Sequence, residues 1–362
     1  MATKRNTQLD GWRAFGVLGV MWLHWIPDAW ETPLPFETGL YFFLTLTGFF
    51  VTRVVLRDKA AGKPKLYQTM VRRRAMRIMI PCFAAFAFAW IVRAPDFVEN
   101  PGWYLAQLAN FHIASLPAWP SGTSHYWTLA IQSQFYLLWP LVILMLPRRA
   151  LIPACLVTAL LAPLSRYILQ TEFSHLPQAG AITSCCLDYL GLGALLAVLL
   201  QRGMAADDKR LKAVAWVAAT IYAVLYSLEE AGHTIEGIRY FKQTFLTIAL
   251  CGLIAASLSG LPRWLAWLLE HPVTRHIAKI SYSLYLFHTL VPLALGWVVP
   301  FLWKLPEGHA TSALMMGVFG LASWGVCWLS WRYIEVPVER WRNRATATVS
   351  RIDEPAAASD TA

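Results

Sequence analysis

Long apolar runs separated by short polar segments recur from one end of this 362-residue chain to the other. Each run approaches the roughly 20 residues that a helix needs to cross the hydrocarbon core of a bilayer. The pattern predicts ten membrane-spanning helices, of which the ninth is interrupted by proline. The ten runs cover residues 10–27, 36–56, 75–93, 126–147, 150–169, 181–200, 211–229, 241–260, 278–302 and 311–334.

The composition agrees with a protein that lies in a bilayer. Hydrophobic residues make up 57% of the chain and charged residues only 14%, whereas a soluble domain carries about 25% charged residues. The 18 Trp and 13 Tyr residues suit the two water interfaces of a membrane. We therefore predict an all-α polytopic membrane helix bundle over residues 1–344, followed by a disordered cytoplasmic tail over 345–362, where residues are small and polar.

The distribution of basic residues predicts the topology. If the N-terminus is cytoplasmic, 24 of the 31 Lys and Arg residues fall in cytoplasmic segments and only four in outer segments. This asymmetry follows the positive-inside rule for an even number of spans, with both termini in the cytoplasm. The net charge of +10 thus reflects topology and lipid headgroups, and it gives no reason to expect a nucleic acid partner.

Two further features narrow the interpretation. The first run has no small-residue cleavage site and carries Arg13 and His24, so we do not expect it to be a cleaved signal peptide. The cysteines all lie in apolar runs without the spacing of metal ligands, and we predict apolar packing and no metal site. They are Cys82, Cys155, Cys185, Cys186, Cys251 and Cys327.

Arg13 and His24 are the first candidates for chemistry. They are eleven residues apart, which on a helix is about three turns and a rise of about 16 Å, so they share one stripe at different depths. An ionisable residue inside a span points to a functional site. A neutral imidazole can act as a general base, but His24 could also only link helices, and Arg13 could reach the headgroups and pair with Asp10.

Six blocks in order carry a resemblance to a known family. The chain resembles the acyltransferase-3 family of integral membrane acyltransferases over nearly its whole length. LDGWRAFGVLGVMWLH is similar to the family's LDGLRG…H opening, and YFFLTLTGFFVTR to its FFxxSGF span, with Thr47 in place of Ser. The other blocks are RRRAMRIMIP, HYWTLAIQSQFYLLWP, ISYSLYLFH and WRYIEVPVERW.

The resemblance implies a function and several roles. It implies transfer of an acyl group, typically acetyl from acetyl-CoA, to a carbohydrate hydroxyl at the plasma (inner) membrane, with His24 and Arg13 catalytic. Arg74 and Arg77 match the family's RxxR and would hold the donor phosphates, because guanidinium groups suit phosphate oxygens. Without the resemblance they would be ordinary positive-inside anchors.

Further polar and aromatic side chains in the predicted spans are also candidates for the functional site. His288, near Tyr285, could line the acceptor path or bond a neighbouring helix. Asp188 is predicted to be catalytic, with Arg166 as one candidate partner, because an anion in a span needs one. Tyr285 and His288 are predicted to bind substrate or donor together with Trp127 and Gln132.

Gln132 departs from the family pattern. The family usually has a glutamate at this position, and an amide cannot take up a proton as a carboxylate does. Either another acid, such as Asp188 or Asp10, substitutes for it, or His24 works with neutral partners, or the protein is an inactive member.

Two functions from other classes remain open. Buried ionisable residues such as His24, Asp188 and His288 also occur in proton-coupled transporters and flippases, although we find no internal repeat. A non-catalytic membrane scaffold is the third interpretation. The acceptor, the acyl length, direct transfer against an acyl-histidine intermediate, and the oligomeric state are not predicted.

Overall fold

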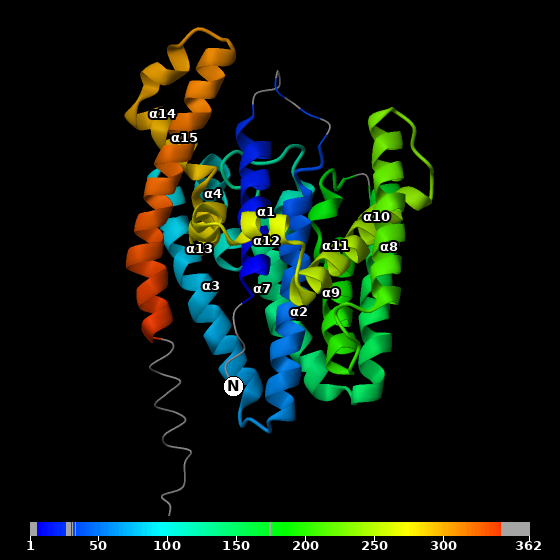
Figure 1. Ribbon diagram of the computed structural model, residues 1–362. Helices are drawn as coiled ribbons and strands as arrows, with labels where there is room; N and C mark the ends of the chain where they lie inside the picture. The colour runs from blue at the N-terminus through cyan, green and yellow to red at the C-terminus, as the bar shows by residue number, and fades with distance from the viewer. Residues whose placement is uncertain (1–5, 27–29, 31, 33, 174, 342–362) are drawn as a thin grey trace, which may run out of the picture.

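The structure is a computed structural model that describes residues 6–341 except 27–29, 31, 33 and 174. The described residues form helices joined by turns, with no strand among them. Figure 1 shows the long helices packed side by side, with the turn between α2 and α3 at one end of the bundle. The long helices are α1 (Thr7–Trp25), α2 (Thr38–Ala60), α3 (Leu66–Ile91), α7 (Tyr126–Met145), α8 (Leu151–Glu172), α9 (Leu187–Gln201), α10 (Lys209–Glu230), α11 (Lys242–Ser259) and α15 (His309–Ser330).

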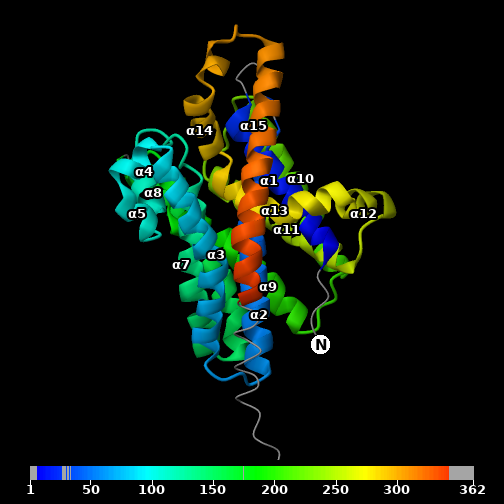
Figure 2. The same ribbon diagram turned by 90° about the vertical axis from the view of Figure 1, so that its left-hand side faces the viewer.

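Shorter helices connect and cover this bundle. Three follow one another between α3 and α7, and α12 extends outward from the bundle in Figure 2. A π-helix (Trp331–Glu335) continues α15. The shorter α-helices are α4 (Pro95–Glu99), α5 (Pro101–Leu105), α6 (Ala109–Ser115), α12 (Arg263–Glu270), α13 (Pro272–Phe287) and α14 (Leu290–Val298). The 3₁₀ segments are Arg148–Ala150, Ala179–Ala181, Thr183–Cys186, Ile238–Phe241 and Pro300–Lys304.

The helical membrane fold predicted from the sequence is confirmed. Eight of the ten predicted runs coincide with helices that are long and apolar enough to cross a bilayer. The first run forms α1, which has 19 residues and carries both Arg13 and His24. The ninth run is divided between α13 and α14. The count of ten spans and the cytoplasmic termini stay predictions, and the predicted tail at 345–362 lies outside the described residues.

The break between α13 and α14 has a local cause. Pro292 has no amide proton, so it cannot donate to the carbonyl of His288 four residues earlier, and its ring crowds that carbonyl. Trp25 takes over the carbonyl, because its indole Nε1 donates to the oxygen of His288 at 2.9 Å. The proline thus places a helix end at His288 and ties that end to α1.

Glycines allow the central helices α2 and α9 to approach closely. A Cβ at Gly48 would lie 2.1 Å from the carbonyl oxygen of Leu190, and one at Gly193 would lie 2.2 Å from that of Thr45. Small residues let backbones meet in this way in membrane bundles, where lipid supplies little driving force for association.

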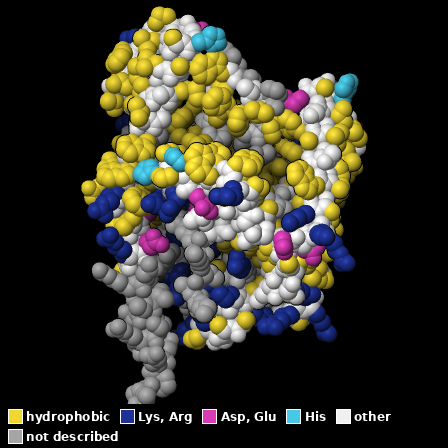
Figure 3. Space-filling model, viewed as in Figure 1, with side chains coloured by type: hydrophobic (Ala, Val, Ile, Leu, Met, Phe, Trp, Pro, Cys, Tyr) yellow, Lys and Arg dark blue, Asp and Glu magenta, His cyan; other side chains and the backbone are white. Residues whose placement is uncertain are grey.

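The basic residues of the molecule are unevenly distributed. Figure 3 shows the Lys and Arg side chains on this face gathered mainly in its lower half, the end where the α2–α3 turn lies. The distribution matches the asymmetry of the sequence. All six cysteines are buried and unpaired by disulfides, as expected for apolar packing residues.

Replacing Gly48 with Ala should lower the thermal midpoint of the purified protein by several degrees. The added methyl group has no room beside Leu190, and overpacking costs about 1–3 kcal/mol. Gly317→Ala in α15 is the matched control, since a Cβ there meets no atom within 4 Å. Equal midpoints for the two variants in a fluorescence melt would show that α2 and α9 are not packed this closely.

Candidate functional site

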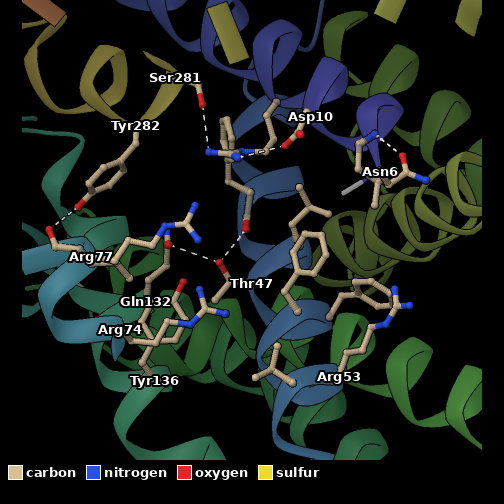
Figure 4. Close-up of a pocket in the computed structure, with 18 of the residues that line it drawn as sticks. Asn6, Asp10, Thr47, Arg53, Arg74, Arg77, Gln132, Tyr136, Ser281 and Tyr282 are labelled. Carbon is tan, nitrogen blue, oxygen red and sulfur yellow. Dashed lines mark hydrogen bonds and ion pairs between the residues drawn. The ribbon is translucent and has the colours of Figure 1, made fainter. Parts of the chain in front are cut away.

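A cavity of about 1340 Å³ lies between α1, α2, α3, α7 and α13. Six cationic and three acidic side chains line it, an excess that favours an anionic ligand. Figure 4 shows several of them around the hollow. The charged lining residues are Asp10, Arg13, Arg53, Arg57, Arg74, Arg77, Lys279, Glu335 and Glu339.

Hydrogen bonds and ring contacts fix two of these arginines. The guanidinium of Arg13 donates to Ser281 Oγ at 3.1 Å and pairs with Asp10 at 3.4 Å. That of Arg74 lies 5.1 Å from the ring centre of Tyr136. Arg13 is thus bound to its own helix, as expected, and also to α13.

Arg74 and Arg77 come together on the wall that α3 contributes (Figure 4). Gln132 and Tyr285 line the same cavity, and the amide oxygen of Gln132 accepts a hydrogen bond from Thr47 at 3.4 Å. The structure therefore gathers four of the predicted donor-binding residues in one place.

Contacts between α2 and α7 hold the cavity wall. Lys59 donates to the last carbonyls of α7, including that of Ile143 at 2.7 Å, where a cation also offsets the negative end of the helix dipole. Trp139 Nε1 donates to Thr52 at 2.7 Å. These contacts tie α7, which carries Gln132, to α2, which carries Thr47.

Glu335 reaches the cavity from the π-helix after α15. Its carboxylate accepts a hydrogen bond from Ser283 at 2.5 Å. No ion pair joins it to Arg332 within the part of the chain that the structure describes. π-helical turns are rare and frequent at functional sites, and this one turns Glu335 inward.

His24 lies near the C-terminal end of α1, whereas Arg13 lies in its first half; His24 is exposed and does not line the cavity. Its Nδ1 is 2.8 Å from the carbonyl oxygen of Val20 and 3.3 Å from Nε2 of His288. Because a carbonyl can only accept, the proton of neutral His24 is on Nδ1. Its Nε2 therefore carries the lone pair that a base needs.

His288 is fixed in the complementary tautomer. Its Nδ1 lies 2.9 Å and 3.1 Å from the carbonyl oxygens of Tyr285 and Leu284, so this nitrogen donates. Its Nε2 is then an acceptor, and it shares the hydrogen-bond donor Nδ1–H of His24 with the closer carbonyl oxygen of Val20. Val20 and His288 together thus fix the orientation of the His24 ring. The contact to a neighbouring helix, one of the two roles expected for His288, is present.

His125 is a third member of this cluster that sequence reasoning missed. Its ring centre lies 4.8 Å from that of His288 and 6.4 Å from that of His24. It is buried, and its Nε2 has no hydrogen-bond partner among the described residues. The signal was its position at the head of the HYWTLAIQSQFYLLWP block, from which only Trp127 and Gln132 were selected.

Tyr285 lies between the cavity and the histidines. It lines the cavity, while its ring centre is 5.3 Å from that of His125 and 5.9 Å from that of His288. Its hydroxyl donates to the carbonyl of His125 at 2.9 Å and contacts Thr128 Oγ1 at 2.5 Å. Tyr285 is therefore next to both the cavity and the histidine cluster.

Two predicted site residues lie elsewhere. Asp188 is fully buried and takes two hydrogen bonds from Arg166, at 2.7 Å and 2.9 Å, and one from Thr244. The partner expected from the sequence is present, but Asp188 neither lines the cavity nor contacts the histidines. Trp127 is half-buried and packs against Trp119 at a ring separation of 6.1 Å, away from the cavity. Their assigned roles stay predictions without geometric support.

Comparison with known proteins decides the family. The profile of the acyltransferase-3 family, described as an acyltransferase domain, matches residues 6–332. The chain belongs to the acyltransferase-3 family. Peptidoglycan O-acetyltransferase OatA of Listeria monocytogenes is 23% identical over 364 residues, which cover 92% of this chain and 55% of that protein.

Other relatives of this acyltransferase-3 protein come from Staphylococcus aureus. One, from strain COL, is named as a candidate O-acetyltransferase and is 27% identical over 78% of this chain and 50% of its own length. Another, O-acetyltransferase OatA of strain NCTC 8325, is 25% identical over 39% of this chain and 25% of its own length. The chain spans about half the length of the first curated relatives it matches. No solved structure is significantly similar to it.

The structure shows what Gln132 contacts at the position where the sequence resemblance leads us to expect a glutamate. Gln132 hydrogen-bonds Thr47, and within the described residues no hydrogen bond joins it to His24. The side chain that contacts His24 is instead His288. Of the alternatives set out for Gln132, the geometry therefore favours a histidine with a neutral partner.

Replacement of His288 tests whether it positions His24. His288→Gln places an amide oxygen near the original Nε2, whereas His288→Asn mimics Nδ1 and loses the contact with His24. We expect His288→Asn to lower kcat of acyl transfer at least about 10-fold, with His288→Gln retaining clearly more activity. The pH–rate profile should change for His288→Asn and the KM for donor should not. Equal losses in the two variants would indicate a purely structural role.

Proposed function

We propose that this protein is a membrane O-acyltransferase that moves an acyl group, typically acetyl, from a cytoplasmic acyl-CoA to a carbohydrate hydroxyl on the outer side of the plasma membrane. The observation that carries the proposal is the layout of α1. Arg13, in the first half of the helix, lines a cation-rich cavity, and His24, near its C-terminal end, carries its lone pair on Nε2 because Nδ1 faces Val20 and His288. The family membership and the names of the relatives support acyl transfer.

The cavity suits the proposed donor. A coenzyme A thioester carries several phosphate charges and a long flexible pantetheine arm, and arginines bind phosphate oxygens by paired hydrogen bonds. The diphosphate would lie at Arg74 and Arg77, and the arm would extend past Arg13 toward Tyr285. Tyr285 would have to rotate for the thioester to reach the histidines.

The chemistry follows from the tautomers. The acceptor hydroxyl gives its proton to His24 Nε2 while its oxygen forms a bond to the thioester carbonyl carbon. The carbon–sulfur bond then breaks, and the coenzyme A thiolate leaves and takes up a proton. His288 Nε2 keeps accepting from His24 Nδ1, so the imidazolium is held in place. An acyl-histidine formed on the same Nε2 would be the stepwise form of this reaction.

A carrier is the second candidate, because one observation favours it. Membrane carriers bind solute at interrupted helices, and α13 and α14 are interrupted at His288. Solute uptake by vesicles without any acyl transfer would support a carrier over the enzyme.

His24→Ala tests the proposed enzyme. We expect transfer of labelled acetyl from acetyl-CoA to cell-envelope glycans to fall by about 100-fold or more, because general-base catalysis contributes on that scale. Binding of acetyl-CoA should persist, since His24 lies outside the cavity. His233→Ala, at an exposed turn, is the matched control and should keep full activity. Transfer at the normal rate by folded His24→Ala would refute the assignment.

A further inference from the structure

The arginines of the cavity fall into two groups on different helices. Arg74 and Arg77 belong to α3, and Arg53 and Arg57 belong to α2. Figure 4 shows Arg53 on the opposite side of the cavity from Arg74 and Arg77. A ligand that used both groups would need two separated anionic groups.

The two arginines of α2 differ in how far their charges are already compensated. Arg57 pairs with the buried carboxylate of Asp58 at 2.9 Å, and the same carboxylate pairs with Lys63 at 2.8 Å. Arg53 makes no ion pair with a carboxylate in the described part of the chain. Its side chain is exposed to the cavity, so its charge is available to an anion of the ligand.

One aromatic ring contacts this guanidinium, and a second lines the same cavity. The guanidinium carbon of Arg53 lies 5.7 Å from the ring centre of Phe49, and Phe50 is also a lining residue of the cavity. Aromatic faces stack on nucleic acid bases, and an arginine beside them binds the attached phosphate. The α2 wall therefore has the chemistry of a site for a phosphorylated nucleoside.

We propose that Arg53 binds the 3′-phosphate of the adenosine end of the acyl-CoA, with Phe50 against the adenine, while Arg74 and Arg77 hold the diphosphate. The inference rests on the proposed function for the donor itself. Coenzyme A carries its diphosphate and its 3′-phosphate at separate places, which matches the two groups of arginines. An acyl-pantetheine on a carrier protein has no adenosine 3′-phosphate, so Arg53 selects free coenzyme A thioesters.

Binding of two donors to four forms of the whole 362-residue chain tests this inference. Acetyl-CoA and acetyl-3′-dephospho-CoA are compared by equilibrium dialysis with the detergent-purified wild type, Arg53→Gln, Arg77→Gln and Arg149→Gln. The wild type should bind acetyl-CoA about 10-fold or more tightly than the dephospho compound, as expected for one charge-assisted contact. Arg53→Gln should remove most of this preference by weakening acetyl-CoA alone.

The other variants separate the outcomes. Arg77→Gln should weaken both donors and keep their ratio, and Arg149→Gln, exposed outside the cavity, should match the wild type. Three results would overturn the role of Arg53 and leave the proposed donor standing. The wild type could bind both donors equally, Arg53→Gln could keep the preference for acetyl-CoA, or Arg53→Gln could weaken the binding of both donors alike. Wild type that binds neither donor would overturn the proposed donor, and the inference with it.

Discussion

The contact between His24 and His288 is the interaction on which the site depends. It exists because Pro292 ends a helix at His288, and because Trp25 takes the carbonyl that the proline leaves without a donor. The same helix end leaves the carbonyls of Leu284 and Tyr285 near His288 Nδ1, which decides the tautomer. One interruption of one helix thus turns two histidines 264 residues apart into an oriented pair.

The second constraint is that the cationic side chains of the cavity and the histidine cluster lie apart from one another. The basic residues line a cavity on one side of Tyr285, and the histidines lie on the other side. Under the proposed function, this arrangement would keep the charged part of the donor out of the apolar interior, where a charge is costly. Only the uncharged thioester arm would pass Tyr285, and it would meet there an acceptor that comes from the opposite face.

Much of the fold and part of the site could be predicted from the sequence. The apolar runs predicted the helices, and the RxxR and LDG…H blocks selected Arg74, Arg77, Arg13 and His24. Tertiary packing decided the rest. The sequence placed His288 near mid-span but could not show that it faces His24. His125 stands at the head of the HYWTLAIQSQFYLLWP block, but nothing in the sequence showed that its imidazole is buried beside His288. Asp188 was selected as a charged residue inside a span, and the structure shows that its carboxylate is paired with Arg166.

Transfer across a sealed membrane is the most direct measurement of the central claim. In inside-out vesicles, labelled acetyl-CoA is supplied only to the face where the α2–α3 turn lies, with cell-envelope glycans enclosed on the other face. The account predicts that O-acetyl label appears on the enclosed glycans and depends on His24. Label on glycans supplied beside the acetyl-CoA, with none on those enclosed, would contradict it.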